Sequence, residues 1–224
     1  MYLNKLTSFM NFKVVFVTIL LYCFSNIGFS QTNDWKFIKK SDGISIYHRK
    51  VGSGNLKDVK IETMFDSNLS TITEALLDVS SFNKWIYKVD YSKVLKVIGA
   101  NQVEYYNRID MPWPSSDRDI VAINKLYQNP QTKEVVSEDI CNWKGLPEKK
   151  DLVRIKDFYA KWTFVPTANG VKGTYIFHSD PGGELPAAVV NLFIDEGPVN
   201  SIKGLKRMLK IEKYRNSNSH NIIN

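Results

Sequence analysis

The sequence predicts an α+β domain in which a curved antiparallel sheet wraps around one long C-terminal helix. Two observations support this fold class. Runs that alternate apolar and polar residues, or that are rich in β-forming residues, recur along most of the chain between turn signals. The final segment instead spaces its apolar residues three and four apart, as an amphipathic helix does. Each layer has one apolar face to bury, and a strongly curved sheet commonly leaves a cavity beneath the helix.

The first predicted elements are a hairpin and a short helix. Ile44 to Val51 alternates apolar and polar residues and predicts a strand, and Val59 to Phe65 predicts its partner. Asn68 or Ser70 can then cap a helix that continues through Val79 with its apolar residues on one face.

Six further strands and a helix complete the predicted domain. The strands are Val94 to Ile98, Gln102 to Asp110, Asp119 to Tyr127, Lys133 to Ile140, Leu152 to Val165 and Gly170 to His178. The helix opens at Leu185-Pro186, because proline fits the first turn of a helix, and it continues to about Tyr214. Gly197-Pro198 inside it predicts a kink or a break. The segment from Asn216 to Asn224 is rich in Asn and Ser and predicts a disordered tail.

Residues 1–30 predict a signal peptide. Two lysines provide the positive charge at its start, and the apolar run Val14 to Phe24 is short for a membrane span, which needs roughly 20 residues. Gly28 and Ser30 occupy the small-residue positions before a cleavage site near Ser30. We therefore expect an exported protein, periplasmic or secreted. An uncleaved anchor and a lipid attached to Cys23 stay open as alternatives.

The exported chain has the length of one domain with a sizeable core, which we place at residues 31–215. The formal net charge of +7 falls to +5 once the two lysines of the signal peptide are removed. This mild basic excess fits a solvated surface or attraction to anionic lipid head groups, whereas no basic-aromatic repeat points to nucleic acid. Cys141 alone cannot form an internal disulfide, and the three histidines lack metal-ligand spacing. The sequence thus predicts a monomer without a metal or cofactor.

One corner of the chain carries the strongest candidate for a binding site. Met111-Pro-Trp-Pro-Ser-Ser-Asp-Arg-Asp-Ile-Val121 joins two strand-like runs, and the second run opens with Arg118-Asp119. An arginine at the head of such a strand can point into the interior of the sheet, where its guanidinium needs a polar or anionic partner. Arg118 could instead bond the carbonyls of its own corner. Asp119 would face the other way and is expected to be structural.

The order of elements and four local motifs resemble the START domain, the lipid-transfer module related to the steroidogenic acute regulatory protein. The motifs are Phe82-Asn-Lys-Trp85, Pro112 to Val121, Leu152 through Pro166, and Asp180 to Pro186 with Asn191. They occur in the family's order and spacing, and the resemblance covers about Trp35 to Lys213. It implies a helix-grip fold with an internal hydrophobic tunnel for one ligand, a phospholipid or a sterol-like lipid, under a lid formed by the C-terminal helix. It also implies binding and transfer during transient contact with a membrane surface, without catalysis.

Eight residues are candidate ligand contacts. Some lipid-binding relatives pair the corner arginine with a carboxylate on the preceding strand, where this chain has Arg108. Glu104, Tyr106 and Arg108 share one face of that strand by period two. If that face is inward, two arginines line the tunnel and favour an anionic head group. The other candidates are Arg118, Trp113, His178, Val189 and Phe193. For Trp113 corner packing is the alternative, for His178 an ordinary hydrogen-bonded histidine, and for the last two a role in the core.

Two other functions stay open. A helix-grip enzyme of the cyclase or hydrolase type would need an acid–base group inside the tunnel, for which His178, Glu104 and Tyr106 are the candidates. A lipid-responsive sensor would bind the same ligand as a signal. No Ser-His-Asp order, Gly-rich phosphate loop or acid pair supports a catalytic site.

Overall fold

One large sheet organises the part of the chain that the computed structural model describes, which is residues 34–51, 57–183, 185–186, 189–190 and 192–224. Its strands are β1 (Lys36–Ser41), β2 (Ile44–Lys50), β3 (Lys57–Phe65), β4 (Val89–Gly99), β5 (Gln102–Ile109), β6 (Arg118–Gln128), β7 (Val135–Cys141), β8 (Val153–Arg154), β9 (Asp157–Thr167) and β10 (Gly170–Asp180). The order across the sheet is β1-β2-β3-β10-β9-β7-β6-β5-β4, all antiparallel, and β8 pairs in parallel with β6. The predicted signal peptide lies outside the described residues.

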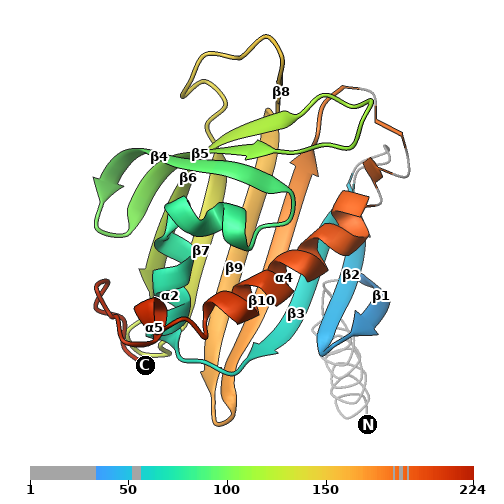
Figure 1. The fold of residues 1–224 in the computed structure, drawn as a ribbon. Helices are drawn as coiled ribbons and strands as arrows, with labels where there is room; N and C mark the ends of the chain where they lie inside the picture. Colours follow the sequence, from blue (N-terminus) through green and yellow to red (C-terminus); the bar gives the residue numbers. More distant parts are fainter. Residues whose placement is uncertain (1–33, 52–56, 184, 187–188, 191) are drawn as a thin grey trace, which may run out of the picture. The chain divides into compact units, whose positions relative to one another are not determined.

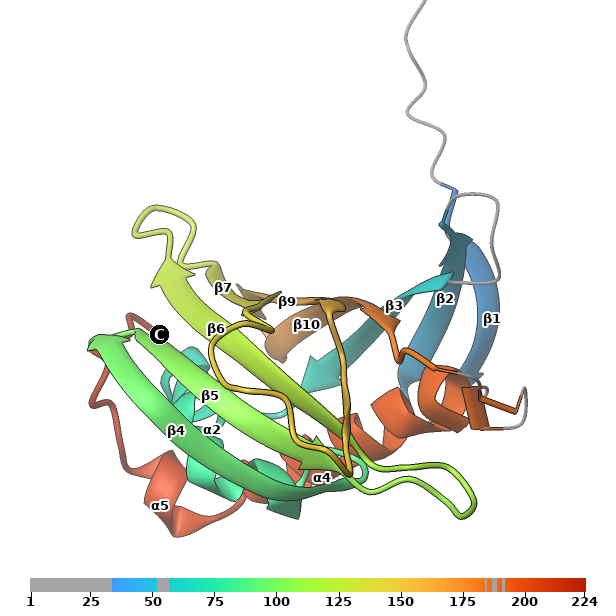
Figure 2. The same ribbon diagram turned by 90° about the horizontal axis from the view of Figure 1, so that it is seen from above.

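The helical elements lie on one side of this sheet. They are α2 (Leu69–Leu77), the 3₁₀ helix η1 (Val79–Lys84), the π-helical turn η2 (Leu192–Glu196), α4 (Gly197–Met208) and α5 (Glu212–Arg215). Figures 1 and 2 show α4 crossing the concave face of the curved sheet, with α2 beside its C-terminal end. The sheet stays open at β1 and β4. The predicted α+β helix-grip fold is confirmed.

The core joins both layers through large side chains that are almost fully buried. Phe65 from β3 makes edge-to-face contacts with Trp162 and Phe164 of β9, at ring centroid distances of 6.0 and 5.8 Å. Gly173 on β10 makes room for this cluster, because a Cβ there would stand 2.5 Å from Cε2 of Phe65. Leu205 of α4 is buried in the same core. The helix is thus held against the sheet by apolar packing.

Helix α2 begins where the sequence predicts. The side chain of Asn68 accepts a hydrogen bond from the backbone N–H of Thr71 at 2.8 Å, which satisfies one of the free donors of the first turn. Ile72, Ala75 and Leu76 then lie buried against the sheet. The predicted apolar face of this helix is therefore the face that packs.

The sequence does not predict strand β1, and it predicts β8 and β9 as a single strand. The segment of β1 reads Lys-Phe-Ile-Lys-Lys-Ser and is exposed along its whole length, so it lacks the half-buried alternation that marks a strand. Its lysines suit an edge strand, where charge opposes pairing with another sheet. Between β8 and β9 the chain leaves the sheet at Ile155 and Lys156.

The C-terminal helix is shorter than the sequence predicts. Helix α4 starts at Gly197, with Pro198 in its first turn, directly after the π-helical turn η2, so the helical segment breaks where the sequence predicts a kink or break. Gly204 lies where α4 crosses η1, and a Cβ on it would stand 2.5 Å from the backbone O of Trp85. Glycine at this position lets the helix approach the backbone of its neighbour closely.

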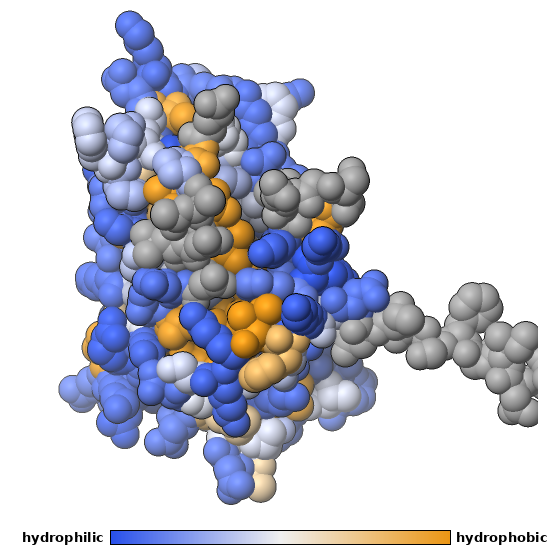
Figure 3. All heavy atoms as spheres, turned by 90° about the vertical axis from the view of Figure 1, so that its right-hand side faces the viewer, coloured by the Kyte–Doolittle hydropathy of each residue, from blue (hydrophilic) through white to orange (hydrophobic). Residues whose placement is uncertain are grey.

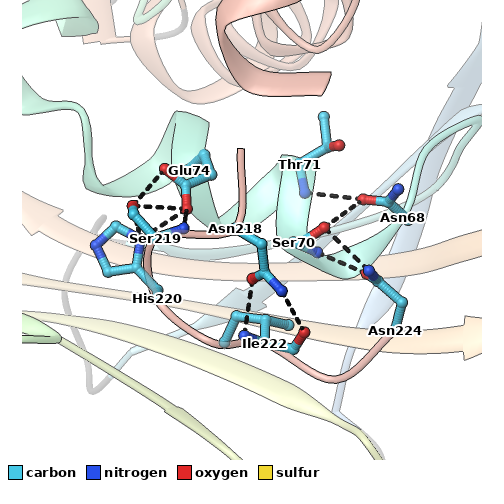
Figure 4. A network of polar contacts seen from close by, with 9 residues as sticks. All are labelled: Asn68, Ser70, Thr71, Glu74, Asn218, Ser219, His220, Ile222 and Asn224. Carbon is cyan, nitrogen blue, oxygen red and sulfur yellow. Dashed lines mark hydrogen bonds and ion pairs between the residues drawn. The ribbon is translucent and has the colours of Figure 1, made fainter. Parts of the chain in front are cut away.

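The tail from Asn216 to Asn224 is ordered, against the predicted disorder. Figure 4 shows it running along the start of α2, where Glu74 accepts hydrogen bonds from the backbone N–H and Oγ of Ser219 at 2.6 and 2.8 Å. Asn224 Oδ1 accepts from the backbone N–H of Ser70, and Ile222 is buried. The tail's polar composition suggests disorder, but its polar groups have hydrogen-bond partners on α2, which the composition does not reveal.

Neither a membrane-spanning helix nor a metal cluster is present among the described residues. No helix there is both long enough and apolar enough to cross a membrane. No group of three His, Cys, Asp or Glu side chains in that part of the chain could hold a metal ion.

Candidate ligand-binding cavity

A cavity of about 220 Å³ lies between the sheet and the C-terminal segment. Its walls are mostly apolar and aromatic, with contributions from β5, β6, β7, β9, β10, η1 and α4. Among its described lining residues are Phe82, Trp85, Tyr105, Ile109, Ile120, Phe158, Trp162, Tyr175, Phe177, Phe193, Ile194 and Ile202. Such walls suit the hydrocarbon part of a ligand, since apolar area removed from water stabilises a complex by about 25 cal/mol per Å².

The alternation of side chains along each strand decides which residues face the cavity. On β5 these are Tyr105, Asn107 and Ile109, and on β6 they include Ile120 and Asn124. The residues between them point to the opposite face of the sheet. The inward face of β5 is therefore the odd-numbered one, whereas the sequence analysis had considered the even-numbered one.

A polar cluster around Asp139 interrupts the apolar wall. Asp139 on β7 and Asn124 on β6 are directly opposite each other in the sheet. Asp139 Oδ1 accepts hydrogen bonds from the Asn124 side-chain amide at 3.0 Å and from the Tyr105 hydroxyl at 3.0 Å. The same amide also donates to Ser137 Oγ at 2.8 Å. Asp139, Asn124, Ser137 and Tyr105 all line the cavity.

Burial controls the ionisation of this cluster. Removal from water raises the pKa of the Asp139 carboxyl to about 6, although its hydrogen bonds to Asn124 and Tyr105 oppose that rise. Burial raises the pKa of the Tyr105 hydroxyl well above its usual value, and the neighbouring Asp139 charge adds to the effect. Tyr175, across the cavity wall, shows an upward pKa shift with the same two causes. At neutral pH the cluster therefore carries one buried negative charge among neutral hydroxyl and amide groups.

Several buried polar atoms on the cavity wall have no hydrogen-bond partner. They are Oδ1 of Asn124, Oδ1 of Asn107 and Nε1 of Trp85. Both asparagines are almost fully buried, at 3% and 5% exposure. Unpaired buried polar groups are rare and costly in folded proteins, so these atoms mark a place for a polar ligand group.

Arg118 lies at the other end of β6 and donates three hydrogen bonds to backbone carbonyls. Its Nε and Nη2 donate to the carbonyls of Pro181 and Gly182 at 3.3 and 3.1 Å, and its Nη1 donates to the carbonyl of Ser116. The guanidinium thus joins the Pro-Trp-Pro corner to the segment that precedes the C-terminal helix. It also borders the cavity, and burial lowers its pKa. These contacts agree with the structural alternative that the sequence left open for Arg118.

The predicted face with Glu104, Tyr106 and Arg108 lies on the outside of the sheet. Arg108 forms a two-pronged ion pair with Asp90 on the exposed edge, with Nη2 2.6 Å from Oδ2. Glu104 accepts from the side chain of Asn142 at 2.5 Å, and the Tyr106 hydroxyl contacts Lys149 Nζ at 3.1 Å. These two partners belong to the loop between β7 and β8, which covers this face. The proposed pair of arginines in one pocket is therefore wrong.

Asp119 has the structural role that the sequence predicts. It lies on the same outer face and forms a fully buried ion pair with Arg154, at 2.6 Å from Nε and 3.0 Å from Nη2. Arg154 also donates to the carbonyls of Trp143, Leu146 and Pro147. This pair fixes the β7–β8 loop to the sheet.

Trp113 and His178 also lie away from the cavity. The Trp113 side chain is 92% exposed, so neither corner packing nor ligand contact describes it. His178 points to the outer face of β10, where Nδ1 is 2.9 Å from Asp58 and Nε2 is 3.1 Å from Asp157. It is an ordinary hydrogen-bonded histidine, the alternative that the sequence favoured.

Phe193 and Val189, the two apolar candidates of the C-terminal segment, differ in whether they line the cavity. Phe193 lines the cavity and packs edge-to-face on Tyr87 at 6.0 Å. Val189 does not line it, whereas its neighbour Val190 does.

The polar cluster was the main feature that sequence reasoning missed. Asn124, Ser137 and Asp139 sit on strands whose apolar alternation they interrupt, and each looks like a solvent-facing residue in the sequence. The sequence signal is that each of them alternates in register with the buried residues of its strand. Asn124 follows Ile120 and Ala122 at even positions, and Asp139 follows Val135 and Ser137 at odd ones. Polar residues in phase with a buried face predict a polar site within it.

Comparison with known proteins places the chain in a family. The START domain family matches residues 25–214, which is most of the chain. The chain belongs to the START family. An uncharacterized START relative from Pseudomonas aeruginosa is 31% identical over 184 residues, covering 82% of this chain and 90% of that protein. Members of this family bind and transfer lipids, as the resemblance had implied.

Two further relatives of this START domain have descriptive names. Phosphatidylcholine transfer protein of Rattus norvegicus is 25% identical over 181 residues, covering 77% of this chain and 82% of that protein. The crystal structure of a STAR-related lipid transfer protein from Xanthomonas axonopodis is 28% identical, with a TM-score of 0.74. The match covers 80% of this chain and 100% of the Xanthomonas axonopodis chain. The helix-grip arrangement of sheet and C-terminal helix is thus shared with an experimentally solved START protein.

Proposed function

We propose that this START domain binds a single lipid in the cavity between its sheet and its C-terminal segment and carries it between membranes without catalysis. The observation that carries the proposal is a cavity with aromatic and aliphatic walls and one polar cluster inside it. A lipid has the same division into an apolar body and a polar end. Transfer of each methylene group from water into such walls contributes roughly 0.8 kcal/mol.

The size of the cavity limits how the ligand is held. At about 220 Å³ it is smaller than the roughly 300–1,000 Å³ of pockets that enclose drug-sized ligands. A lipid with two long chains would therefore need the C-terminal segment to move outward, whereas a single chain requires less movement. Segment motion of this kind also gives the ligand a route in and out.

Two neighbouring valines give a direct test of cavity binding. Val190 lines the cavity and Val189 does not, although both are half-buried in the same short stretch. We expect Val190→Glu to abolish the copurification of lipid, as measured by mass spectrometry of an organic extract, and Val189→Glu to retain it. Equal lipid content in the two variants, with both folded by circular dichroism, would contradict the proposal.

The enzyme alternative loses the residues proposed for it. His178, Glu104 and Tyr106 all lie on the outer face of the sheet, away from the cavity. Asp139 is the acidic side chain among the described lining residues, and its raised pKa would suit acid–base chemistry. Recovery of intact lipid after prolonged incubation with the protein supports carriage, whereas conversion of the extracted lipid would favour the enzyme.

We also propose export and transient docking on a membrane. The apolar run and small residues near Ser30 support cleavage there, and N-terminal sequencing of the protein from its native cell envelope tests it. Docking is supported by the exposed Trp113, since tryptophan favours membrane interfaces. Figure 3 also shows apolar side chains in a band between hydrophilic ones on one face of the domain.

A further inference from the structure

The cavity has polar groups at its two ends, and they differ in what they offer a ligand. Arg118 and Asn124 are six positions apart on β6, which corresponds to roughly 20 Å along an extended strand. At the Arg118 end the guanidinium can only donate, and three of its five N–H donors bond the carbonyls of Ser116, Pro181 and Gly182. At the Asn124 end, described polar atoms remain without partners. A ligand group that donates a hydrogen bond therefore finds its acceptor at the Asn124 end.

The free capacity at that end consists mainly of hydrogen-bond acceptors. Asp139 Oδ1 receives both hydrogen bonds that the carboxylate accepts, from Asn124 and Tyr105, so Oδ2 is left available. Oδ1 of Asn124 is a further acceptor without a donor there, and Oδ1 of Asn107, which lies opposite Ile120 nearer the Arg118 end, is another in the cavity wall. The orientation of the Asn124 amide is fixed by its own bonds, because Asp139 can only accept and Nδ2 must face it. The Trp85 indole N–H is the one unpaired donor among these described lining residues.

The charges around Asp139 strengthen the same preference. The basic side chains among the described lining residues are Lys57, which is exposed at the start of β3, and Arg118, far along β6. No ion pair to Asp139 is formed within the described part of the chain. A phosphate or carboxylate placed beside this group would meet a like charge in a low-dielectric site, whereas a donor would meet an acceptor strengthened by its charge.

We propose that the Asp139–Asn124–Tyr105 cluster selects a lipid whose buried polar end donates a hydrogen bond, such as a hydroxyl, an amide or a primary ammonium group, and rejects an anionic end. This inference rests on the proposed lipid-binding function and names the ligand chemistry of the same cavity. It replaces the expectation of an anionic head group held by Arg118 and Arg108. The Trp85 indole N–H on the same cavity wall is a donor from which a hydroxyl or amide oxygen of the ligand can accept.

The test uses single-chain probes that differ only at the polar end. They are a long-chain alcohol, its methyl ether, the long-chain amine and the long-chain carboxylate, each titrated into delipidated full-length protein by calorimetry. We expect the alcohol or the amine to bind roughly tenfold or more tightly than the ether, because a hydrogen bond to a charged group is lost in the ether. The carboxylate should bind most weakly. The alcohol and amine arms separate a neutral donor from a cationic one.

Two variants assign the preference to the cluster. Asp139→Leu should bring the alcohol and the ether to equal affinity, and Asp139→Asn, which keeps the shape of the side chain, should keep only part of the preference. Arg108→Leu, on the exposed outer edge, should leave the preference unchanged. If the Leu variant does not fold, the wild-type ranking and the Asn variant still decide.

The outcomes separate this inference from the proposed function. Tightest binding of the carboxylate, or equal binding of alcohol and ether to the wild-type protein, overturns the donor preference while lipid binding stands. Failure of all four probes to bind overturns the proposed function itself.

Discussion

At the scale of single residues, the domain uses two carboxylates in opposite ways on the two faces of one sheet. Asp119 faces outward and is neutralised by Arg154 in a buried ion pair. Asp139 faces the cavity and is held by neutral donors only. The first fixes a loop, and the second keeps an unneutralised charge beside the proposed ligand.

Removal of the Asp119 carboxylate should be strongly destabilising. Asp119→Ala leaves the Arg154 guanidinium buried without its counter-charge, which costs about 3–5 kcal/mol in comparable pairs. Glu148→Ala removes the partner of Lys156 in a pair that is half exposed, and should cost less than about 1 kcal/mol. Urea unfolding of both variants gives the comparison, and equal losses would show that Asp119 is not structural.

Asp139 should make the stability of the domain depend on pH in a definite direction. Its pKa is about 6 in the folded protein, whereas an unfolded aspartate has a pKa of roughly 3.9. Between these values the folded state holds a proton that the unfolded state has lost, so the contribution of Asp139 to the free energy of unfolding falls as the pH rises. Above pH 6 its ionised form opposes folding by on the order of 2–3 kcal/mol.

Asp139→Asn tests this pH dependence, because an amide at position 139 does not titrate. Its free energy of unfolding, minus that of the wild type, should increase between about pH 4 and pH 6 and then level off. Ser137→Ala alters the same cluster without removing a titrating group, so its difference from the wild type should stay constant with pH. A constant difference for the Asn variant as well would contradict the raised pKa.

At the scale of elements, the sequence predicts the strands well and the C-terminal segment poorly. Strand alternation and turn signals locate β2, β3, β5 and β6 closely, since local pattern and burial agree there. The alternation of a strand does not say which of its two faces points inward. For β5 the sequence therefore offers the face with Glu104 as a possible inner face, whereas Tyr105 on the other face lines the cavity. The start of α4 at Gly197 and the packing of the tail on α2 depend on contacts with distant parts of the chain. Such contacts leave no periodic mark in the sequence.

The close contact between α4 and η1 depends on Gly204, which has no side chain. Gly204→Ala should raise the intrinsic helix propensity by about 1 kcal/mol, yet its Cβ would stand 2.5 Å from the backbone O of Trp85. Backbone cannot yield as a flexible side chain can, so we expect a net loss of about 1–3 kcal/mol. Gly99→Ala, where a Cβ meets nothing within 4 Å, is the control. A Gly204→Ala protein with a raised melting temperature would show that α4 moves freely.

At the scale of the whole domain, binding and release require the sheet and the C-terminal segment to separate and close again. Arg118 is one polar link between them, because it bonds both its own corner and the carbonyls of Pro181 and Gly182. The sequence locates this arginine and offers its bond to a carbonyl of its own corner as an alternative, but it does not predict the carbonyls of Pro181 and Gly182, which lie more than sixty positions further along the chain.

Loss of this link should accelerate ligand exchange. Arg118→Met keeps most of the apolar stem and removes all three hydrogen bonds, so the closed form should open more often and bound lipid should leave several-fold faster. Stopped-flow transfer of a spin-labelled lipid to acceptor vesicles measures the rate. Arg108→Met serves as the control, since that side chain pairs only with Asp90 on the exposed edge. An unchanged release rate in a folded Arg118→Met protein would exclude a gating role.

The distribution of indole rings gives this domain two separate optical reporters. Trp85 and Trp162 are buried in the cavity wall, so their emission and quenching respond to what fills it. Trp113 is 92% exposed on the corner at the start of β6, and its emission maximum should shift to shorter wavelength when that corner enters a lipid bilayer. Trp35 and Trp143 do not line the cavity, so a variant with Trp35, Trp113 and Trp143 replaced by Phe would leave Trp85 and Trp162 to follow the ligand. A second variant that keeps Trp113 alone would report the arrival at a membrane, so the two events could be timed independently.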